Sequence, residues 1–254
     1  MQKKPLLLFA FSFFLFNVSN AQNFTLGVTG GISIPNLTAG GSQENPLNTG
    51  YKSRLGPDAS IFGEFRVSSL FSVEMRAEYS SQGGKKSGIQ AFPTPPAMAA
   101  MFPDGQAPQY LYANFKSEAK LNYLLVPVLG KFGWDVKNSP LRIYVDAGPF
   151  AGFLLSAHQV TSGSSNIYAD KEGMQQLSQS PQSFDANNDI KDQLNTYNFG
   201  LSGNVGVAYK LNSSKIFIEG GGNYGFLNIQ KGTANGKNNT GAGTLSLGYG
   251  YTFK

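Results

Sequence analysis

The chain has 254 residues, and its charged residues make up only 14% of the sequence, well below the share of about 25% in soluble domains. It contains no cysteine, which excludes a disulfide framework, a thiolate metal site, a cysteine nucleophile and a lipidated cysteine. A single histidine excludes a histidine-rich metal site, and the net charge of +5 is too small and too scattered for a nucleic-acid surface.

The first 21 residues have the organisation of a secretory signal peptide. Lys3 and Lys4 form a short positive region, and an almost unbroken apolar run covers residues 6–16. Ser19, Asn20 and Ala21 then place small residues where a signal peptidase cleaves. We therefore expect a signal peptide at residues 1–21, cleaved after Ala21, followed by one domain at residues 22–254. The apolar run is too short for a membrane-spanning helix, which needs about 20 residues.

The rest of the chain contains no second long apolar segment. Its longest apolar run is residues 124–129, which includes Pro127. This excludes a helical membrane protein, but it does not exclude a membrane β-barrel, whose strands alternate apolar and polar residues.

Eight segments show that alternation. In residues 244–253 the odd positions are Leu, Leu, Tyr, Tyr and Phe, whereas the even positions are Thr, Ser, Gly, Gly and Thr. A period of two predicts a strand with one apolar face and one small or polar face. The eight predicted strands are residues 24–34, 59–67, 71–80, 120–134, 141–155, 196–207, 216–226 and 244–253.

The lengths of the connectors indicate how these strands are arranged. Residues 68–70, 135–140 and 212–214 form short connectors, and they alternate with long ones at residues 36–54, 83–116 and 158–194 and an intermediate one at 230–239. This predicts an all-β fold, an eight-stranded antiparallel up-and-down transmembrane β-barrel with short periplasmic turns and long extracellular loops. A soluble periplasmic barrel of the lipocalin type is the alternative, and it would turn the apolar faces inward.

The barrel topology turns nine charged side chains toward the lumen. Eight strands enclose a narrow lumen that side chains fill, and buried charges need partners. We expect a plugged lumen with a structural polar network, although a proton or ion path and general acid–base catalysis at Glu74 and Glu78 remain alternatives. The predicted network consists of Glu64, Arg66, Glu74, Arg76, Glu78, Lys131, Arg142, Asp146 and Glu219.

Two long connectors have a composition that suggests specific contacts. Residues 92–103 are rich in proline and contain Met98, Met101 and Phe102, which either contact a partner or pack on the barrel mouth. Residues 168–194 are rich in Gln, Asn, Asp and Ser, and residues 170–177 suggest a helical turn.

Three motifs resemble the PorT-like outer-membrane β-barrel proteins of Bacteroidetes, a group of eight-stranded barrels. Residues 123–132 read Tyr-Leu-Leu-Val-Pro-Val-Leu-Gly-Lys-Phe, and residues 147–155 read Ala-Gly-Pro-Phe-Ala-Gly-Phe-Leu-Leu. The ending, with Tyr249, Tyr251 and Phe253, is similar to the signal that the barrel-insertion machinery reads. Two positions depart from the pattern: Leu125 stands where an acid is common, and Lys254 follows the final aromatic residue.

The resemblance implies a location in the outer membrane and leaves the activity open, because the founding member serves protein secretion and gliding whereas the group is broad. We expect a non-enzymatic barrel that needs no cofactor and no metal. Its expected partners are outer-membrane lipid, the insertion machinery and a protein of an envelope or secretion complex, but not nucleic acid. The alternatives are a narrow conduit for ions or small molecules and an outer-membrane hydrolase.

Overall fold

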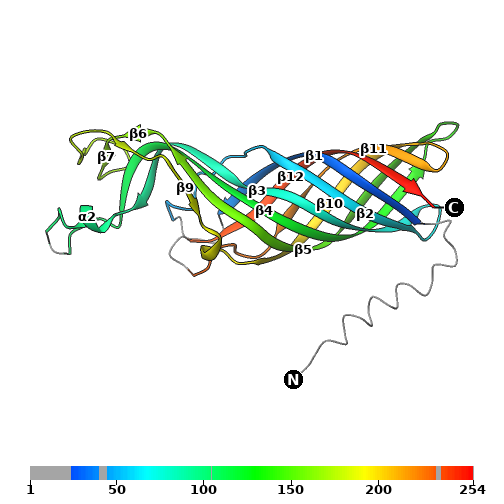
Figure 1. Cartoon of the computed structure of the whole chain (residues 1–254), viewed down its shortest axis with the longest axis horizontal. Coiled ribbons are helices and arrows are strands. Elements are labelled where there is room, and N and C mark those ends of the chain that lie inside the picture. The colour runs from blue at the N-terminus through cyan, green and yellow to red at the C-terminus, as the bar shows by residue number, and fades with distance from the viewer. Residues whose placement is uncertain (1–23, 40–44, 104, 233–235, 254) are drawn as a thin grey trace, which may run out of the picture.

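A computed structural model describes residues 24–39, 45–103, 105–232 and 236–253. Within them, eight long strands close into a ring and form a barrel (Figure 1). The expected signal peptide lies outside the described residues. The strands of the ring are β1 (Phe24–Ala39), β2 (Gly56–Arg66), β3 (Phe71–Pro93), β4 (Tyr110–Asp135), β5 (Leu141–Ser162), β10 (Tyr197–Lys210), β11 (Ser214–Gly225) and β12 (Asn238–Thr252).

Each strand of the ring pairs antiparallel with its neighbours in the order β1-β2-β3-β4-β5-β10-β11-β12. The seam between β1 and β12 closes the ring, with Gly27 opposite Gly250 and Gly31 opposite Ser246. This confirms the predicted up-and-down topology. Closure leaves none of the eight strands as an open edge, which is the condition for placing a sheet in lipid.

The observed alternation confirms that the apolar faces of the strands point outward. Leu247 is 67% exposed and Ile61 is 61% exposed, whereas the inward Glu74 is fully buried. The exposed apolar band runs through residues 24–34 of β1 and 71–79 of β3, a length that matches the 9–11 residues of a membrane-spanning strand. No helix among the described residues has the length and apolar character of a membrane span.

Aromatic side chains border this band at both ends. Phe24 and Phe253 stack with ring centroids 6.0 Å apart at one rim. Phe153 and Tyr197 meet at 5.6 Å near the other rim. Aromatic rings at the two lipid–water interfaces are typical of membrane barrels.

Glycines on the lumen side make room for aromatic rings. A Cβ atom added at Gly27 would lie 2.3 Å from the ring of Phe62, and one added at Gly248 would lie 2.1 Å from the ring of Phe217. Phe62 and Phe217 pack edge to face inside the barrel, with centroids 5.7 Å apart. The small residues on the polar face therefore provide the volume that these rings fill.

The two ends of the barrel differ strongly. At one end, called the turn end, residues 67–70, 136–140 and 211–213 make short connections. At the opposite loop end, β3, β4 and β5 continue past the ring, as Figure 1 shows. Smaller elements accompany this extension: α2 (Pro96–Ala99), β6 (Ser164–Ser165), β7 (Ile167–Tyr168), β8 (Gln182–Ser183), β9 (Ala186–Asp189) and η2 (Lys191–Gln193).

Two of the predicted loops differ from expectation. Most of residues 83–116 belongs to a β3–β4 hairpin, which pairs Lys85 with Glu118 and Pro93 with Tyr110. The helical turn expected at residues 170–177 is absent from that described segment, where the chain forms a tight turn instead. The carboxylate of Asp170 accepts hydrogen bonds from the backbone of Met174 and Gln175, and thereby replaces helical bonds.

Candidate functional site

The middle of the lumen holds a network of ion pairs centred on Arg76. The Nε atom of Arg76 donates to Glu74 at 2.5 Å, and its Nη1 and Nη2 atoms both bind the carboxylate of Glu219. The hydroxyl of Tyr144 donates to the same carboxylate at 2.9 Å. Arg76 thus joins β3 to β11 across the lumen, with its own side chain 5% exposed.

A second cation, Lys131 of β4, extends the network toward β2 and β5. Its ammonium group binds Glu74 and lies 3.8 Å from both Glu64 and Asp146. Glu64 also accepts a hydrogen bond from Lys215 of β11. Each of the four acids in these contacts therefore meets at least one base. This matters because a buried charge without a partner costs several kcal/mol.

The structure brings together six of the nine residues predicted for the network, in one lumenal region. Glu64, Glu74, Arg76, Lys131, Asp146 and Glu219 are linked by the contacts above. Glu78 is also buried, but it has no ion pair within the described residues.

Arg66 and Arg142 lie outside this network. Arg66 is the last residue of β2 and is exposed. Arg142 instead binds Asp135 at 2.9 Å and the backbone carbonyl of Ser69 at the turn end. Both arginines occupy positions that the alternation assigns to the lumen face, but they stand where the barrel opens to solvent. The alternation shows which face a side chain lies on, but not how deep it lies along the strand.

The sequence reasoning missed Lys215, Asp58 and Tyr144. Lys215 has the same parity as Phe217 and Glu219, and Asp58 has the same parity as Ser60 and Glu64. The alternation therefore carried the signal for Lys215 and Asp58, each one residue before the predicted start of its strand, and for Tyr144, which lies within the predicted strand 141–155. Tyr144 donates a hydrogen bond to Glu219, and its ring lies 4.4 Å from the ammonium group of Lys131.

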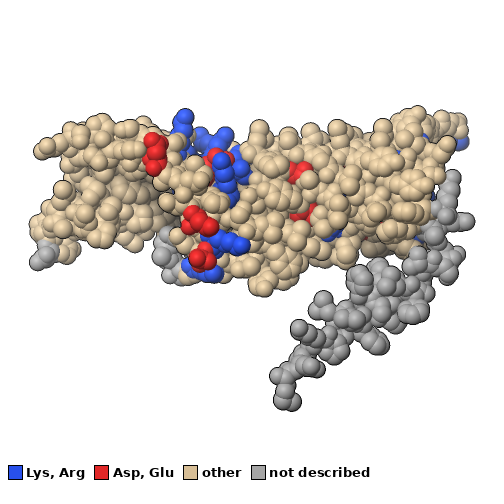
Figure 2. Space-filling view, in the orientation of Figure 1, with Lys and Arg blue, Asp and Glu red and all other residues tan. Residues whose placement is uncertain are grey.

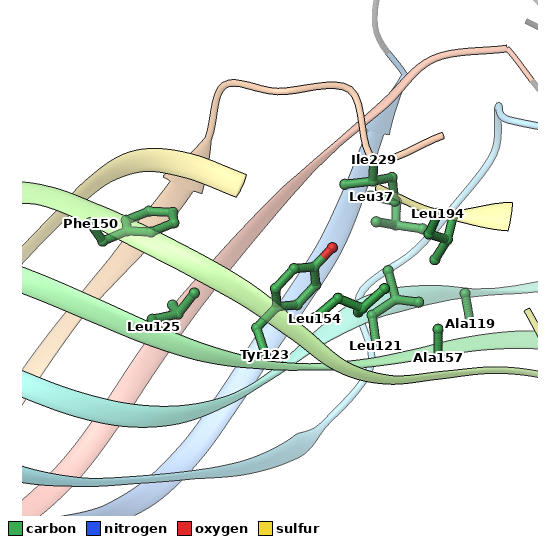
Figure 3. Close-up of a cluster of buried hydrophobic side chains, with 10 residues drawn as sticks. All are labelled: Leu37, Ala119, Leu121, Tyr123, Leu125, Phe150, Leu154, Ala157, Leu194 and Ile229. Carbon is green, nitrogen blue, oxygen red and sulfur yellow. The ribbon is translucent and has the colours of Figure 1, made fainter. Parts of the chain in front are cut away.

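An apolar cluster, which we call the mouth cluster, lies at the loop end of the lumen (Figure 3). Strand residues such as Leu121 and Leu154 meet Leu194 and Ile229, which come from the long connections after β5 and β11. The hydroxyl of Tyr123 is buried in this cluster and has no hydrogen-bond partner among the described residues. The mouth cluster comprises Leu37, Ala119, Leu121, Tyr123, Leu125, Phe150, Leu154, Ala157, Leu194 and Ile229.

Charged side chains gather between the barrel and its extension on the face of the molecule that Figure 2 shows. Arg54 binds Glu118 at 2.6 Å. Lys86 donates to the carbonyl of Leu47 at 2.7 Å and lies 4.3 Å from the ring centroid of Tyr51. Burial lowers the pKa of Lys86 to about 8 and raises the pKa of Tyr51 to about 12.

The proline-rich segment lies at the tip of the β3–β4 hairpin. Pro95 precedes α2, and the backbone amide of Thr94 binds the carbonyl of Gln109 at the base of the tip. Met101 is 77% exposed, whereas Met98 and Phe102 are half-buried within the tip. None of these three residues belongs to the mouth cluster as the structure describes it.

The residues of the predicted assembly signal lie on the outer face of the barrel. Tyr251 and Phe253 pack edge to face at 5.3 Å, and Tyr249 is 46% exposed. The described part of the chain contains no group of three or more His, Cys, Asp or Glu side chains placed to hold a metal ion.

Comparison with solved structures gives other outer-membrane proteins. Neisserial surface protein A has 15% identity and a TM-score of 0.39, with 90% of this chain and 97% of that chain covered. Ail of Yersinia pestis has 11% identity and a TM-score of 0.35 over 90% and 99% of the two chains. OprG of Pseudomonas aeruginosa has 12% identity and a TM-score of 0.36 over 91% and 96%. A search among curated proteins finds no match.

A family profile covers most of the chain. The family described as "Outer membrane protein beta-barrel domain" matches residues 20–231, which is well over half of the 254 residues. The closed ring, the outward apolar band and the polar lumen agree with that description. The turn end is accordingly periplasmic and the loop end extracellular. The chain therefore belongs to the outer membrane protein beta-barrel domain family, and it is an eight-stranded barrel of the outer membrane.

Proposed function

We propose that this barrel is non-enzymatic, that its lumen is plugged, and that it works through contacts of its extracellular part, either at the cell surface or in an envelope or secretion complex. The observation that carries the proposal is the double closure of the lumen. The ion network centred on Arg76 fills its middle, and the mouth cluster fills its loop end. A pathway through the barrel would have to break both layers.

The space left between these side chains supports the same conclusion. A lumenal cavity lined by Asp58, Arg76, Glu78 and Glu219 measures about 10 Å³, which is room for about one water molecule. A narrow conduit for ions or small molecules is the alternative function, and it requires an opening that admits more than this. The polar side chains of the lumen favour this alternative, because ions and polar molecules pass more easily through a polar channel.

The extracellular hairpin is the best candidate for a contact surface. Its tip carries Met101 in an exposed position, and Met98 and Phe102 support the tip from within. Flexible, polarizable methionines are suited to protein contacts. By resemblance to the PorT-like barrels of Bacteroidetes, the partner would be a protein of an envelope or secretion complex.

The assembly of the protein completes the proposal. Export would begin with the signal peptide at residues 1–21, and the insertion machinery would read Tyr249, Tyr251 and Phe253 at the periplasmic rim. The outward position of these three side chains is consistent with recognition before the barrel is surrounded by lipid.

Conductance of the purified protein in planar bilayers tests the plugged lumen. We expect no stable conductance, because two layers of side chains close the barrel. A reproducible single-channel current from the unmodified protein would contradict the proposal and favour the conduit. As a positive control, a variant that opens both layers, with Arg76→Ser and Lys131→Ser in the ion network and Leu121→Ala and Leu154→Ala in the mouth cluster, should give a leak.

Site-specific photo-crosslinking in cells tests the contact surface. A photoreactive residue at Met101 should capture a discrete partner, whereas the same residue at Leu247, on the lipid-facing wall, should not. Both positions are more than half exposed, so the probes are comparably accessible. Equal patterns at the two positions would contradict a contact through the hairpin tip.

A further inference from the structure

The charges inside the barrel do not balance. Among the described residues, the lumen within the apolar band holds six acids and three bases. The bases are Arg76, Lys131 and Lys215, and their contacts go to Glu64, Glu74, Asp146 and Glu219. The remaining acids, Asp58 and Glu78, have no ion pair within 4 Å in the described part of the chain.

These two acids lie side by side on neighbouring strands. Asp58 of β2 is opposite Ser80 of β3, and Glu78 is two residues further along β3 on the same inward face. Asp58 is 5% exposed and Glu78 is 8% exposed. The hydroxyl of Ser80 lies beside both carboxylates, but it has one proton and can donate to only one of them.

The shortage of donors leaves acceptor atoms without partners. The Oδ2 atom of Asp58 is buried and has no hydrogen-bond partner among the described residues. The Oε1 atom of Gln82 is in the same situation, and its amide nitrogen binds Ser80 and Asn223. Carboxylate oxygens accept hydrogen bonds and also bind cations, so either a donor or a cation would satisfy the Oδ2 atom of Asp58.

Asp58 and Glu78 both face the cavity of about 10 Å³. Oxygen-bearing side chains from three other strands complete its wall: Ser202, Asn204, Asn223, Thr244 and Ser246. The Oγ atom of Ser202 is also buried without a partner in the described structure. The wall thus combines the unpaired carboxylates of Asp58 and Glu78, the Arg76–Glu219 ion pair and neutral oxygens around a space the size of one water molecule.

We propose that Asp58 and Glu78 hold one small monovalent cation of the size of Na⁺ in the lumen. A hard cation takes oxygen ligands of these kinds, and one positive charge offsets part of the acid excess. A divalent ion is disfavoured, because only two carboxylates are available and the guanidinium of Arg76 lines the same cavity. A single proton shared by the two acids would also neutralise one charge, and a Tm that depends on pH but not on Na⁺ would identify it.

Thermal unfolding of the full-length barrel, folded in detergent micelles, tests the site. The Tm is measured in a series of NaCl concentrations, with N-methyl-D-glucamine chloride keeping ionic strength and chloride constant. Because a ligand that binds only the folded state stabilises it, we expect a saturable rise of the Tm with Na⁺. Asp58→Asn and Glu78→Gln should each abolish the rise.

Asp135→Asn is the matched control, because it is the same chemical change at an exposed carboxylate of the periplasmic rim. It should keep the full response to Na⁺. If the lumenal variants fail to fold, crystals of the unmodified protein soaked in RbCl or thallium acetate give a second readout, an anomalous peak in the cavity.

A Tm that is identical in the two salts, together with an empty cavity in the soaked crystals, would overturn the proposal. A Tm that depends on pH but not on Na⁺ would also overturn it, since a shared proton would then occupy the pair. Equal loss of the response in the Asp135→Asn control would show a general salt effect and count against the site.

Discussion

The middle of the lumen and its extracellular mouth are held together by different interactions. In the middle, Arg76 and Lys131 hold carboxylates from several strands, and each group is costly to bury without its partner. At the mouth, Leu121, Leu154 and Leu194 exclude water by apolar packing. The first layer therefore depends on particular pairs, whereas the second depends on the total volume that is filled.

The two regions also differ in the polar groups that they leave without partners. The ion network leaves Asp58 and Glu78 without ion pairs in the described residues, and the mouth cluster encloses an unpartnered tyrosine hydroxyl. The former excess can be neutralised by a cation. The hydroxyl of Tyr123 belongs to the apolar cluster and has no hydrogen-bond partner among the described residues. Mutations in the two layers should accordingly differ in size and in sign.

The largest effect is expected for Arg76→Met. The change leaves Glu74 and Glu219 buried without their main partner, which costs about 3–5 kcal/mol of unfolding free energy. Urea unfolding in micelles, followed by intrinsic fluorescence, measures it. Arg142→Met at the rim is the control and should cost no more than about 1 kcal/mol. Similar losses for the two variants would show that the central network contributes no more to stability than the pair at the rim.

Leu121→Ala should cost somewhat less, about 2–4 kcal/mol, because it removes a side chain that is 1% exposed and leaves a cavity in the mouth cluster. Leu245→Ala, on the lipid-facing wall, is the matched control and should cost less than half as much. The same urea titration compares them. A loss at Leu245 as large as that at Leu121 would mean that the mouth cluster adds nothing beyond lipid contact.

Tyr123→Phe should change stability in the opposite direction. The hydroxyl of Tyr123 is buried without a partner in the described structure, so its removal should stabilise the barrel by about 1 kcal/mol. A higher urea midpoint with an unchanged slope would be the expected result. Destabilisation by a similar amount would reveal a partner for the hydroxyl, such as a bound water, and would make the mouth less apolar than described.

The smallest effect concerns Lys86, at the edge of the mouth cluster. Burial lowers its pKa to about 8 from 10.5, so the unfolded chain binds more protons between these values and stability should rise with pH there. Tyr51, with its pKa raised to about 12 from 10.0, reverses the trend above pH 10. Acetylation of Lys86, followed by mass spectrometry, should reach half its maximal rate near pH 8 in the folded protein. A midpoint equal to that of the urea-unfolded protein would contradict this burial.

The fold could be predicted because the strands of a membrane barrel alternate apolar and polar residues, and because its connectors alternate between short and long. The alternation in residues 244–253 fixed the faces of β12, and the alternating connector lengths fixed the order of the strands. The ends of the strands were less predictable. Residues 83–93 lack regular alternation of apolar side chains, because the β3–β4 hairpin leaves the lipid there and loses its two distinct environments.

The sequence predicted that a polar network fills the lumen, but it predicted only some of the residues of that network. Parity placed Glu74 and Arg76 inside, but it could not show that Arg142 lies at the open rim or that Lys215 reaches Glu64 from β11. Such contacts depend on the stagger of strands around the ring. The mouth cluster was not predictable at all, since Leu194 and Ile229 reach the lumen by the path of long loops rather than by strand period.

The seam between β1 and β12 has a consequence for assembly. Within the apolar band, the paired positions on its lumen side carry only small residues: Thr25 with Thr252, Gly27 with Gly250, Thr29 with Gly248, Gly31 with Ser246 and Ser33 with Thr244. The bulky rings and charges above them come from other strands, such as Phe62 of β2 and Phe217 of β11. The first and last strands can therefore join by main-chain hydrogen bonds alone, because no large side chain has to pass another as the cylinder closes.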